Sequence, residues 1–456
     1  MSSQAEVIAR NARKAGNVLK VLSDEQRIFI LHKIHDALKE NAGAIKVANE
    51  VDLKVANETG IKPSLIKRLD LFKGDKFEIM LQGIQEIAEL EDPVGKVLMA
   101  RELDEGLTLY KVTAPVGVLL VIFESRPEVI ANITALAIKS GNAGILKGGK
   151  ESVNTFREMS RIINDCIEKY EPECHVPVNA VQLIETRQDV SDLLNQDDYI
   201  DLVVPRGSNA LVKQIKNNTK IPVLGHADGI CSVYVAKDAD IEKAKRIVYD
   251  AKTNYPAGCN AMETLLINRE AKNWEDVLTN LITKGDVTVH LSEDVKEAYL
   301  QKLQASNLLT DKIRSKIVLA EESDFYREFL SLDCAVKFVN STEDAISHIN
   351  QHSSKHTDSI ITENEASANK FMRGIDSAGV YWNASTRFAD GFRYGFGAEV
   401  GISTAKIHAR GPVGLDGLVT YQYQMRGDGQ IAGDYLGAGG KKAFVHKDLD
   451  INNIVL

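Results

Sequence analysis

One cysteine in the sequence has neighbours that suit a nucleophile. Cys259 follows a Pro-Ala-Gly turn and precedes residues 265–267, an apolar run expected to form a short buried strand. Gly258 leaves space beside the sulfur, so another molecule can approach closely. Backbone amides on either side can point at a thiolate or an oxyanion, and such dipoles lower the pKa of a cysteine and make it reactive. The alternative is a small apolar residue packed beneath a loop, but the polar, glycine-containing neighbourhood favours the reactive interpretation.

The length and composition are those of a large globular chain of ordinary polarity. A chain of 456 residues is too long for one core, so at least two domains are expected. The net charge of −9 argues against nucleic acid as the main partner. No apolar run approaches the ~20 residues of a membrane helix, and the first residues lack the apolar core of a signal peptide. We therefore expect no membrane contact.

The cysteines indicate a reducing compartment. Their number is odd, their spacing is wide, and no metal-type C-x-x-C pair occurs. Free thiols are therefore expected, and with them a cytoplasmic location. The cysteines are Cys166, Cys174, Cys231, Cys259 and Cys334.

The elements that must position Cys259 fall into two α/β halves. Residues 1 to about 90 have helical periodicity, and Ser23 with Gln26 matches a capping box. From about residue 116, buried strands alternate with helices, which is typical of a parallel sheet wrapped by helices. A second alternation begins near residue 231 and includes the strand after Cys259. The predicted fold class is therefore α/β with two parallel sheets.

Polar segments follow the predicted strands of the first sheet at residues 124–126, 147–150 and 206–208. Ligands of open parallel sheets collect beyond these carboxyl ends. Residues 144–150 match G-x-x-x-x-G-K, but Glu151 follows where a phosphate loop needs Ser or Thr, so we reject a nucleotide hydrolase. No G-x-G-x-x-G joins a strand to a helix in this sheet. Lys147 and Lys150 form either a solvated turn or an anion site for a cofactor phosphate.

Three histidines recur every four residues, at His348, His352 and His356. On one helix this spacing makes a metal-binding face. Ser353 and Ser354 weaken the helix, however, and no carboxylate completes a zinc set, so a polar loop over a pocket is the favoured interpretation. The later stretch of residues 388–401 mixes aromatics, glycines and an arginine, and is either a substrate rim or a transition from core to loop.

Motifs along nearly the whole chain carry a family resemblance. The motifs are residues 115–118 (PVGV), 124–127 (ESRP), 146–151 (LKGGKE), 259–264 (CNAMET) and 409–415 (ARGPVGL). In this order and spacing, the chain resembles the gamma-glutamyl phosphate reductase family of the aldehyde dehydrogenase superfamily. The tail beyond Tyr421 is longer than in the shorter members.

The resemblance implies an enzyme of proline biosynthesis that reduces L-glutamyl 5-phosphate to L-glutamate 5-semialdehyde with NADPH and releases phosphate. It also implies an aldehyde dehydrogenase-like fold, with an NADP-binding domain of residues 1–100 and 116–228 and a catalytic domain of residues 229–408. Residues 101–115 and 409–456 would form an oligomerisation arm. A homo-oligomer, dimer or tetramer, is expected, and an association with the kinase that makes the substrate is a further expectation.

The resemblance also assigns roles to individual residues. Cys259 is expected to form a thioester from the acyl phosphate, which then accepts hydride and collapses to the aldehyde. Arg126 falls near the position of an asparagine oxyanion donor in relatives, and arginine suits a dianionic leaving group because its fork pairs with phosphate. No metal is expected. The residues expected to bind the cofactor are Ser125, Lys147, Lys150, Gly207, Ser208 and Glu328.

Two other classes stay open, a hydrolytic NAD(P)-dependent aldehyde dehydrogenase and a non-enzymatic α/β module. A hydrolytic enzyme needs a base to activate water against the thioester, and relatives commonly place a glutamate at the start of the interdomain strand. The alignment places His226 at that position. Histidine can act as a base, so the substitution alone does not decide. The acyl phosphate reaction has no use for water, because phosphate is the leaving group and, in reverse, the attacking group.

Overall fold

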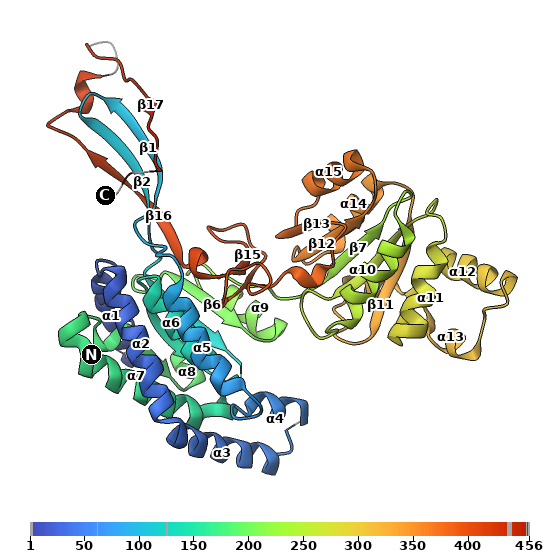
Figure 1. Ribbon diagram of the computed structural model, residues 1–456, viewed down its shortest axis with the longest axis horizontal. Coiled ribbons are helices and arrows are strands. Elements are labelled where there is room, and N and C mark those ends of the chain that lie inside the picture. The colour runs from blue at the N-terminus through green and yellow to red at the C-terminus, as the bar shows by residue number, and fades with distance from the viewer. Residues whose placement is uncertain (1–2, 62, 125, 436–439, 453, 455–456) are drawn as a thin grey trace.

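Two parallel sheets covered by helices and an antiparallel β-arm make up the described part of the chain (Figure 1). The computed structural model describes residues 3–61, 63–124, 126–435, 440–452 and 454. The arm projects away from the body, and the two sheets lie at opposite ends of that body. The predicted α/β class with two parallel sheets is confirmed.

The first sheet is parallel throughout and has the strand order β5-β4-β3-β6. Its central strand β3 is buried at every position, as expected for a strand covered on both faces. The strands are β3 (Val118–Phe123), β4 (Ala143–Lys147), β5 (Val181–Ile184) and β6 (Leu202–Arg206). The helices of this half are α1 (Gln4–Leu19), α2 (Asp24–Glu40), α3 (Ala42–Glu58), α4 (Pro63–Leu69), α5 (Lys76–Glu89), α6 (Val129–Lys139), α7 (Val153–Cys174), α8 (Arg187–Leu193) and α9 (Asn209–Asn217).

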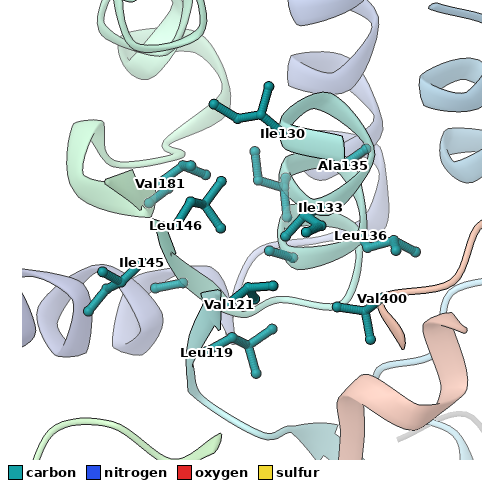
Figure 2. Packing of buried hydrophobic residues seen from close by; sticks show 14 of the residues in the cluster. Leu119, Val121, Ile130, Ile133, Ala135, Leu136, Ile145, Leu146, Val181 and Val400 are labelled. Atoms are coloured by element: carbon teal, nitrogen blue, oxygen red, sulfur yellow. The ribbon is translucent and has the colours of Figure 1, made fainter. Parts of the chain in front are cut away.

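The core of the first half packs α6 against the sheet. Figure 2 shows Leu119 and Val121 of β3 beside Ile133 and Leu136 of α6, all of them buried. Because α6 is apolar on nearly all sides, it is buried on nearly all sides. Val400 lies in this same core, although it follows the second half in sequence. We therefore propose that the catalytic domain ends before residue 398, earlier than the predicted boundary at 408.

The second sheet is also parallel, with the strand order β10-β9-β11-β8-β7-β12-β13. Its strands are β7 (Cys231–Val235), β8 (Met262–Asn268), β9 (Thr288–Leu291), β10 (Ile317–Leu319), β11 (Asp333–Val339), β12 (Thr357–Ile361) and β13 (Gly379–Trp382). The helices are α10 (Ile241–Thr253), α11 (Trp274–Gly285), α12 (Glu293–Ala305), α13 (Asp311–Ser315), α14 (Thr342–His352) and α15 (Glu365–Gly374). Strand β8 is buried at every position, so the segment that carries Cys259 is anchored in the middle of this core.

The arm is a four-stranded antiparallel sheet in the order β16-β2-β1-β17. Its strands are β1 (Val97–Asp104), β2 (Leu107–Pro115), β16 (Val419–Arg426) and β17 (Lys447–Asp448). A short antiparallel pair lies before β16 in the chain and consists of β14 (Gly401–Ser403) and β15 (Gly411–Val413). The pairing of β2 with β16 brings residues 107–115 and the tail side by side, as the family resemblance implies.

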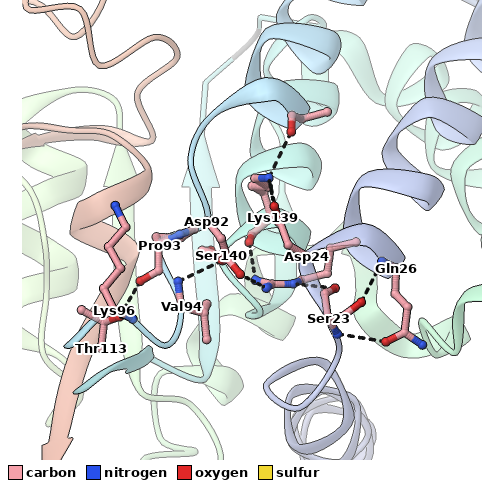
Figure 3. A network of polar contacts seen from close by, with 12 residues as sticks. Ser23, Asp24, Gln26, Asp92, Pro93, Val94, Lys96, Thr113, Lys139 and Ser140 are labelled. Atoms are coloured by element: carbon pink, nitrogen blue, oxygen red, sulfur yellow. Dashed lines mark hydrogen bonds and ion pairs between the residues drawn. The ribbon is translucent and has the colours of Figure 1, made fainter. Parts of the chain in front are cut away.

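A buried polar network ties α2 to α6 and to the segment before the arm (Figure 3). The ammonium of Lys139 is fully buried, donates to Asp24 at 2.7 and 2.9 Å, and donates to the Ala88 carbonyl at 3.0 Å. The guanidinium of Arg27 donates to Asp92 at 2.6 Å and to the Lys139 carbonyl at 2.7 Å. The predicted capping box of Ser23 is present and starts α2 beside these charges. The network therefore fixes the covering helices over the first sheet.

Replacing Lys139 by methionine should lower the free energy of unfolding by about 3 kcal/mol, because Asp24 and the Ala88 carbonyl then lose their shared donor. Urea unfolding of the full chain measures this. The matched control is Lys96→Met, which removes the more exposed ion pair with Glu91 at 3.0 Å and should cost less than about 1 kcal/mol. Equal losses in the two variants would show that the buried network does not stabilise this half.

Candidate active site

The candidate nucleophile lies between the two sheets, where the carboxyl edge of the first sheet approaches the amino edge of the second. Cys259 comes just before β8, at the amino edge of the second sheet, and Glu328 and His356 also precede strands of that sheet. The first sheet contributes its carboxyl edge, where Arg206 ends β6. Arg206 is close enough to Cys259 for an electrostatic interaction, so the two edges approach each other here.

The segment that connects the two sheets passes directly against the cysteine loop. A Cβ at Gly229 would lie 2.1 Å from the Cys259 carbonyl oxygen and 2.5 Å from its Cα, so only glycine fits there. The thiol of Cys231 donates to the same carbonyl at 3.3 Å. On the other side, Asn260 donates to the Ala389 carbonyl at 2.8 Å. The nucleophile is thus held by backbone contacts from two other segments, while its own side chain stays partly exposed.

The electrostatic surroundings of Cys259 differ from the sequence expectation. Burial, followed by the charges of Glu399 and Glu328, raises the pKa of the Cys259 thiol to about 12, against a smaller opposite effect of Arg387. The expected lowering of this pKa was wrong for the free protein, because the sequence does not show that folding buries the cysteine and brings two carboxylates near it. The thiol is therefore protonated at rest, and its proton must leave during any attack.

The two carboxylates are held by backbone amides. Glu328 accepts from the Gly229 amide at 3.0 Å, and Glu399 accepts from the Gly391 amide at 2.9 Å. Burial raises the pKa of both acids. Glu399 also lies 4.0 Å from the Arg206 guanidinium, so it bridges the two halves of the site. The placement of Glu328 beside the nucleophile agrees with its predicted role near the nicotinamide ribose, which stays a proposal.

Two arginines interact electrostatically with Cys259, and a third lies near one of them. Arg387 is nine-tenths buried, and its Nη1 lies so close to Gly258 that a Cβ there would be 2.6 Å away. Arg206 approaches from the facing sheet edge. Arg126, which is predicted to donate hydrogen bonds to the leaving phosphate, is exposed after β3. It is near enough to Arg206 for the two cations to repel. Sequence reasoning missed Arg387, because it lies far along the chain in a stretch without a recognised motif.

Two histidines approach Cys259 from separate segments. His226, Cys259 and His356 each offer a nitrogen or sulfur atom, and these atoms lie within 4.8 Å of one another. The His226 ring stands edge-on to the His356 ring, 5.2 Å between centroids. Burial lowers the pKa of both imidazoles, to about 3 for His356. The three evenly spaced histidines form no common face, since His348 stacks on His352 at 3.9 Å and His356 turns toward His226 instead.

The carboxyl edge of the first sheet fits the anionic parts of a dinucleotide cofactor. Lys147 ends β4 as a nearly buried cation that donates to the Gly148 carbonyl, and burial lowers its pKa. The Ser208 amide at the start of α9 donates to a carboxylate oxygen of Glu124 at 2.8 Å, so this helix start already holds an anionic oxygen.

The remaining predicted cofactor residues lie at the same edge or outside the described residues. A Cβ at Gly207 would lie 2.8 Å from that Glu124 carboxylate, so a larger residue there would displace Glu124. Lys150 is exposed at the end of the turn after β4. Ser125 lies outside the residues that the structure describes.

Comparisons with known proteins agree with this arrangement. The aldehyde dehydrogenase family matches residues 1–296. The gamma-glutamyl phosphate reductase of Saccharomyces cerevisiae is 73% identical over 455 residues, with 100% of both chains covered. The probable gamma-glutamyl phosphate reductase of Schizosaccharomyces pombe is 52% identical, with 98% of this chain and 97% of that protein covered. None of the described helices is long and apolar enough to cross a membrane.

Solved structures show the same fold. The gamma-glutamyl phosphate reductase of Thermotoga maritima superposes with a TM-score of 0.86 at 36% identity, covering 94% of this chain and 100% of that chain. An acetylating aldehyde dehydrogenase of Geobacillus thermoglucosidasius shares the fold at 18% identity with a TM-score of 0.61, over 94% and 97% of the two chains. Taken with the paired sheets and the cysteine between them, these matches show that the chain belongs to the gamma-glutamyl phosphate reductase family, within the aldehyde dehydrogenases.

Proposed function

We propose that this chain reduces L-glutamyl 5-phosphate to L-glutamate 5-semialdehyde with NADPH and releases phosphate, a step of proline biosynthesis. The observation that carries the proposal is the partly exposed Cys259, which lies where the two sheet edges approach each other and interacts electrostatically with Arg206 and Arg387. A substrate that ends in a phosphate dianion fits this setting, because guanidinium groups pair with phosphate through two parallel hydrogen bonds. The names of the full-length relatives favour this reaction over the hydrolytic alternative.

The first half of the reaction forms a thioester on Cys259. The sulfur attacks the acyl carbon, a C–S bond forms, the bond from carbon to the phosphate oxygen breaks, and the thiol proton leaves with the phosphate. A ring nitrogen of His226 lies within 4.8 Å of the sulfur and is placed to carry that proton. Arg126, Arg206 and Arg387 would bind the phosphate as it departs and stabilise its charge.

The second half of the reaction needs a reductant beside the thioester. NADPH supplies a hydride when it is bound. Lys147 and the Ser208 amide would hold its phosphates at the carboxyl edge of the first sheet, and Glu124 would then release that amide. Glu328 would contact the ribose next to the nicotinamide, from the position fixed by the Gly229 amide. These residues act by positioning, while Cys259 alone changes its covalent state.

The arm is proposed to join copies of the chain into a dimer or tetramer. Strand β16 forms one edge of the arm sheet, and its Tyr421, Tyr423 and Met425 side chains are about half exposed. An exposed edge strand with large apolar side chains is a site where another strand can pair.

The described cysteines are free thiols, which suits the cytoplasm. A contact with the kinase that makes the substrate stays part of this proposal.

Oxidation of glutamate 5-semialdehyde by NADP should require inorganic phosphate, because phosphate is the attacking group in the reverse direction. We expect NADPH formation to fall to background when phosphate is replaced by sulfate at equal ionic strength, and free glutamate to be a negligible product. Absorbance of NADPH together with glutamate quantification tests both points. Fast oxidation without phosphate that yields glutamate would establish the hydrolytic dehydrogenase instead.

The cofactor preference should depend on Lys150. An exposed lysine at this turn can pair with the 2′-phosphate of NADPH, and a charge-assisted contact contributes ~1.5–3 kcal/mol, which is about tenfold discrimination or more. Lys150→Glu should erode the ratio of kcat/KM for NADPH to that for NADH by at least this factor. The exposed Lys169→Glu, at the far end of α7, makes the same charge change and should leave the ratio unchanged. Equal kcat/KM values for NADPH and NADH in the unchanged protein would contradict this role of Lys150.

A further inference from the structure

Three side chains that converge at the sulfur could together bind a metal ion. The proposed reaction uses Cys259 and His226 but gives no role to His356. Cys259, His226 and His356 come from the cysteine loop, the segment between the sheets and the start of β12. His356 is 1% exposed, and its Nε2 has no hydrogen-bond partner among the described residues. A buried nitrogen without a partner is costly, so it calls for a ligand.

The second nitrogens of both rings are held in the way that metal-binding histidines usually are. The His226 Nδ1 donates to the Ile402 carbonyl at 3.2 Å, which leaves the lone pair on its Nε2. The His356 Nδ1 lies 2.9 Å from the Thr357 hydroxyl. Such outer contacts orient an imidazole and fix which nitrogen is free to bind a metal.

We propose that Cys259, His226 and His356 bind a borderline divalent cation such as Zn²⁺, which covers the nucleophile and inhibits the enzyme reversibly. One sulfur and two imidazole nitrogens are the ligands that Zn²⁺ prefers, with a water in the fourth position, whereas Mg²⁺ and Ca²⁺ prefer oxygen. In tetrahedral zinc sites the ligand atoms lie about 3.3–3.6 Å apart. The three ligand atoms here lie within 4.8 Å of one another. Small rotations of the side chains would shorten these separations to the values of a zinc site.

The charges around the sulfur favour the same occupant. Glu328 and Glu399, which oppose a thiolate, would favour a dication at that place, while Arg387 opposes it. Binding replaces a proton by the metal, because the S–H bond breaks, an S–Zn bond forms, and the proton goes to water or buffer. No oxidant or reductant takes part, so a chelator should restore the free thiol.

Alkylation of Cys259 tests the site without reference to the proposed reaction. The full chain, reduced and freed of metal, is treated with iodoacetamide in the presence of Zn²⁺ or Mg²⁺, and the Cys259 peptide is quantified by mass spectrometry. We expect submicromolar to micromolar Zn²⁺ to protect Cys259, Mg²⁺ to have no effect, and a chelator to restore alkylation. His356→Asn should raise the zinc concentration for half-protection by about 10–100-fold or more. The exposed His32→Asn on α2 should not change it.

Cobalt gives a second measurement that does not depend on the stability of the His356 variant. Co²⁺ added to the unchanged protein should produce a thiolate-to-cobalt absorption band in the near ultraviolet, and Cys259→Ser should lack it. Equal zinc protection in His356→Asn and the unchanged protein, or no protection by submillimolar Zn²⁺, would overturn the proposal. The absence of a thiolate band in the unchanged protein would overturn it as well.

Discussion

The passage of Gly229 against the cysteine loop is the contact on which the rest of the site depends. A side chain at this position would overlap the backbone of Cys259. Only glycine can therefore occupy it, where the chain passes from the first sheet to the second. The Gly229 amide holds Glu328, and Cys231, two residues later, donates to the Cys259 carbonyl. One close approach therefore sets the distance of the nucleophile from the acid beside it and from the first sheet.

The two sheets use opposite edges to build one site. The carboxyl edge of the first sheet supplies lysine, a helix start and arginine, which suit anions. The amino edge of the second sheet supplies a thiol, a carboxylate and the His356 imidazole, and the segment between the sheets adds the His226 imidazole. Glu399 and Ile402 return from the end of the second half and join these edges through Arg206 and His226. In the proposed reaction, one sheet edge would bind the charged groups of the cofactor, and the other would carry the bond changes.

Local sequence patterns predicted the elements well, because each depends on neighbours in the chain. The buried strand within residues 116–123 and the capping box at Ser23 follow from such patterns, whereas the pairing of β2 with the tail was expected only from the family resemblance. The acidity of Cys259 was predicted in the wrong direction, and Arg387, Glu399 and the turn of His356 toward His226 were missed. Those features are long-range contacts between segments far apart in the chain, and no periodicity or motif records them.

The central claim is that Cys259 carries the acyl group, and its most direct test omits the reductant. The protein is incubated with L-glutamyl 5-phosphate without NADPH, and the Cys259 peptide is examined by mass spectrometry while released phosphate is counted. We expect a glutamyl thioester on Cys259, about one phosphate released per chain, loss of the adduct when NADPH is added, and no adduct in Cys259→Ala. A protein that turns over normally with no adduct on Cys259, or with the acyl group on another cysteine, would contradict it.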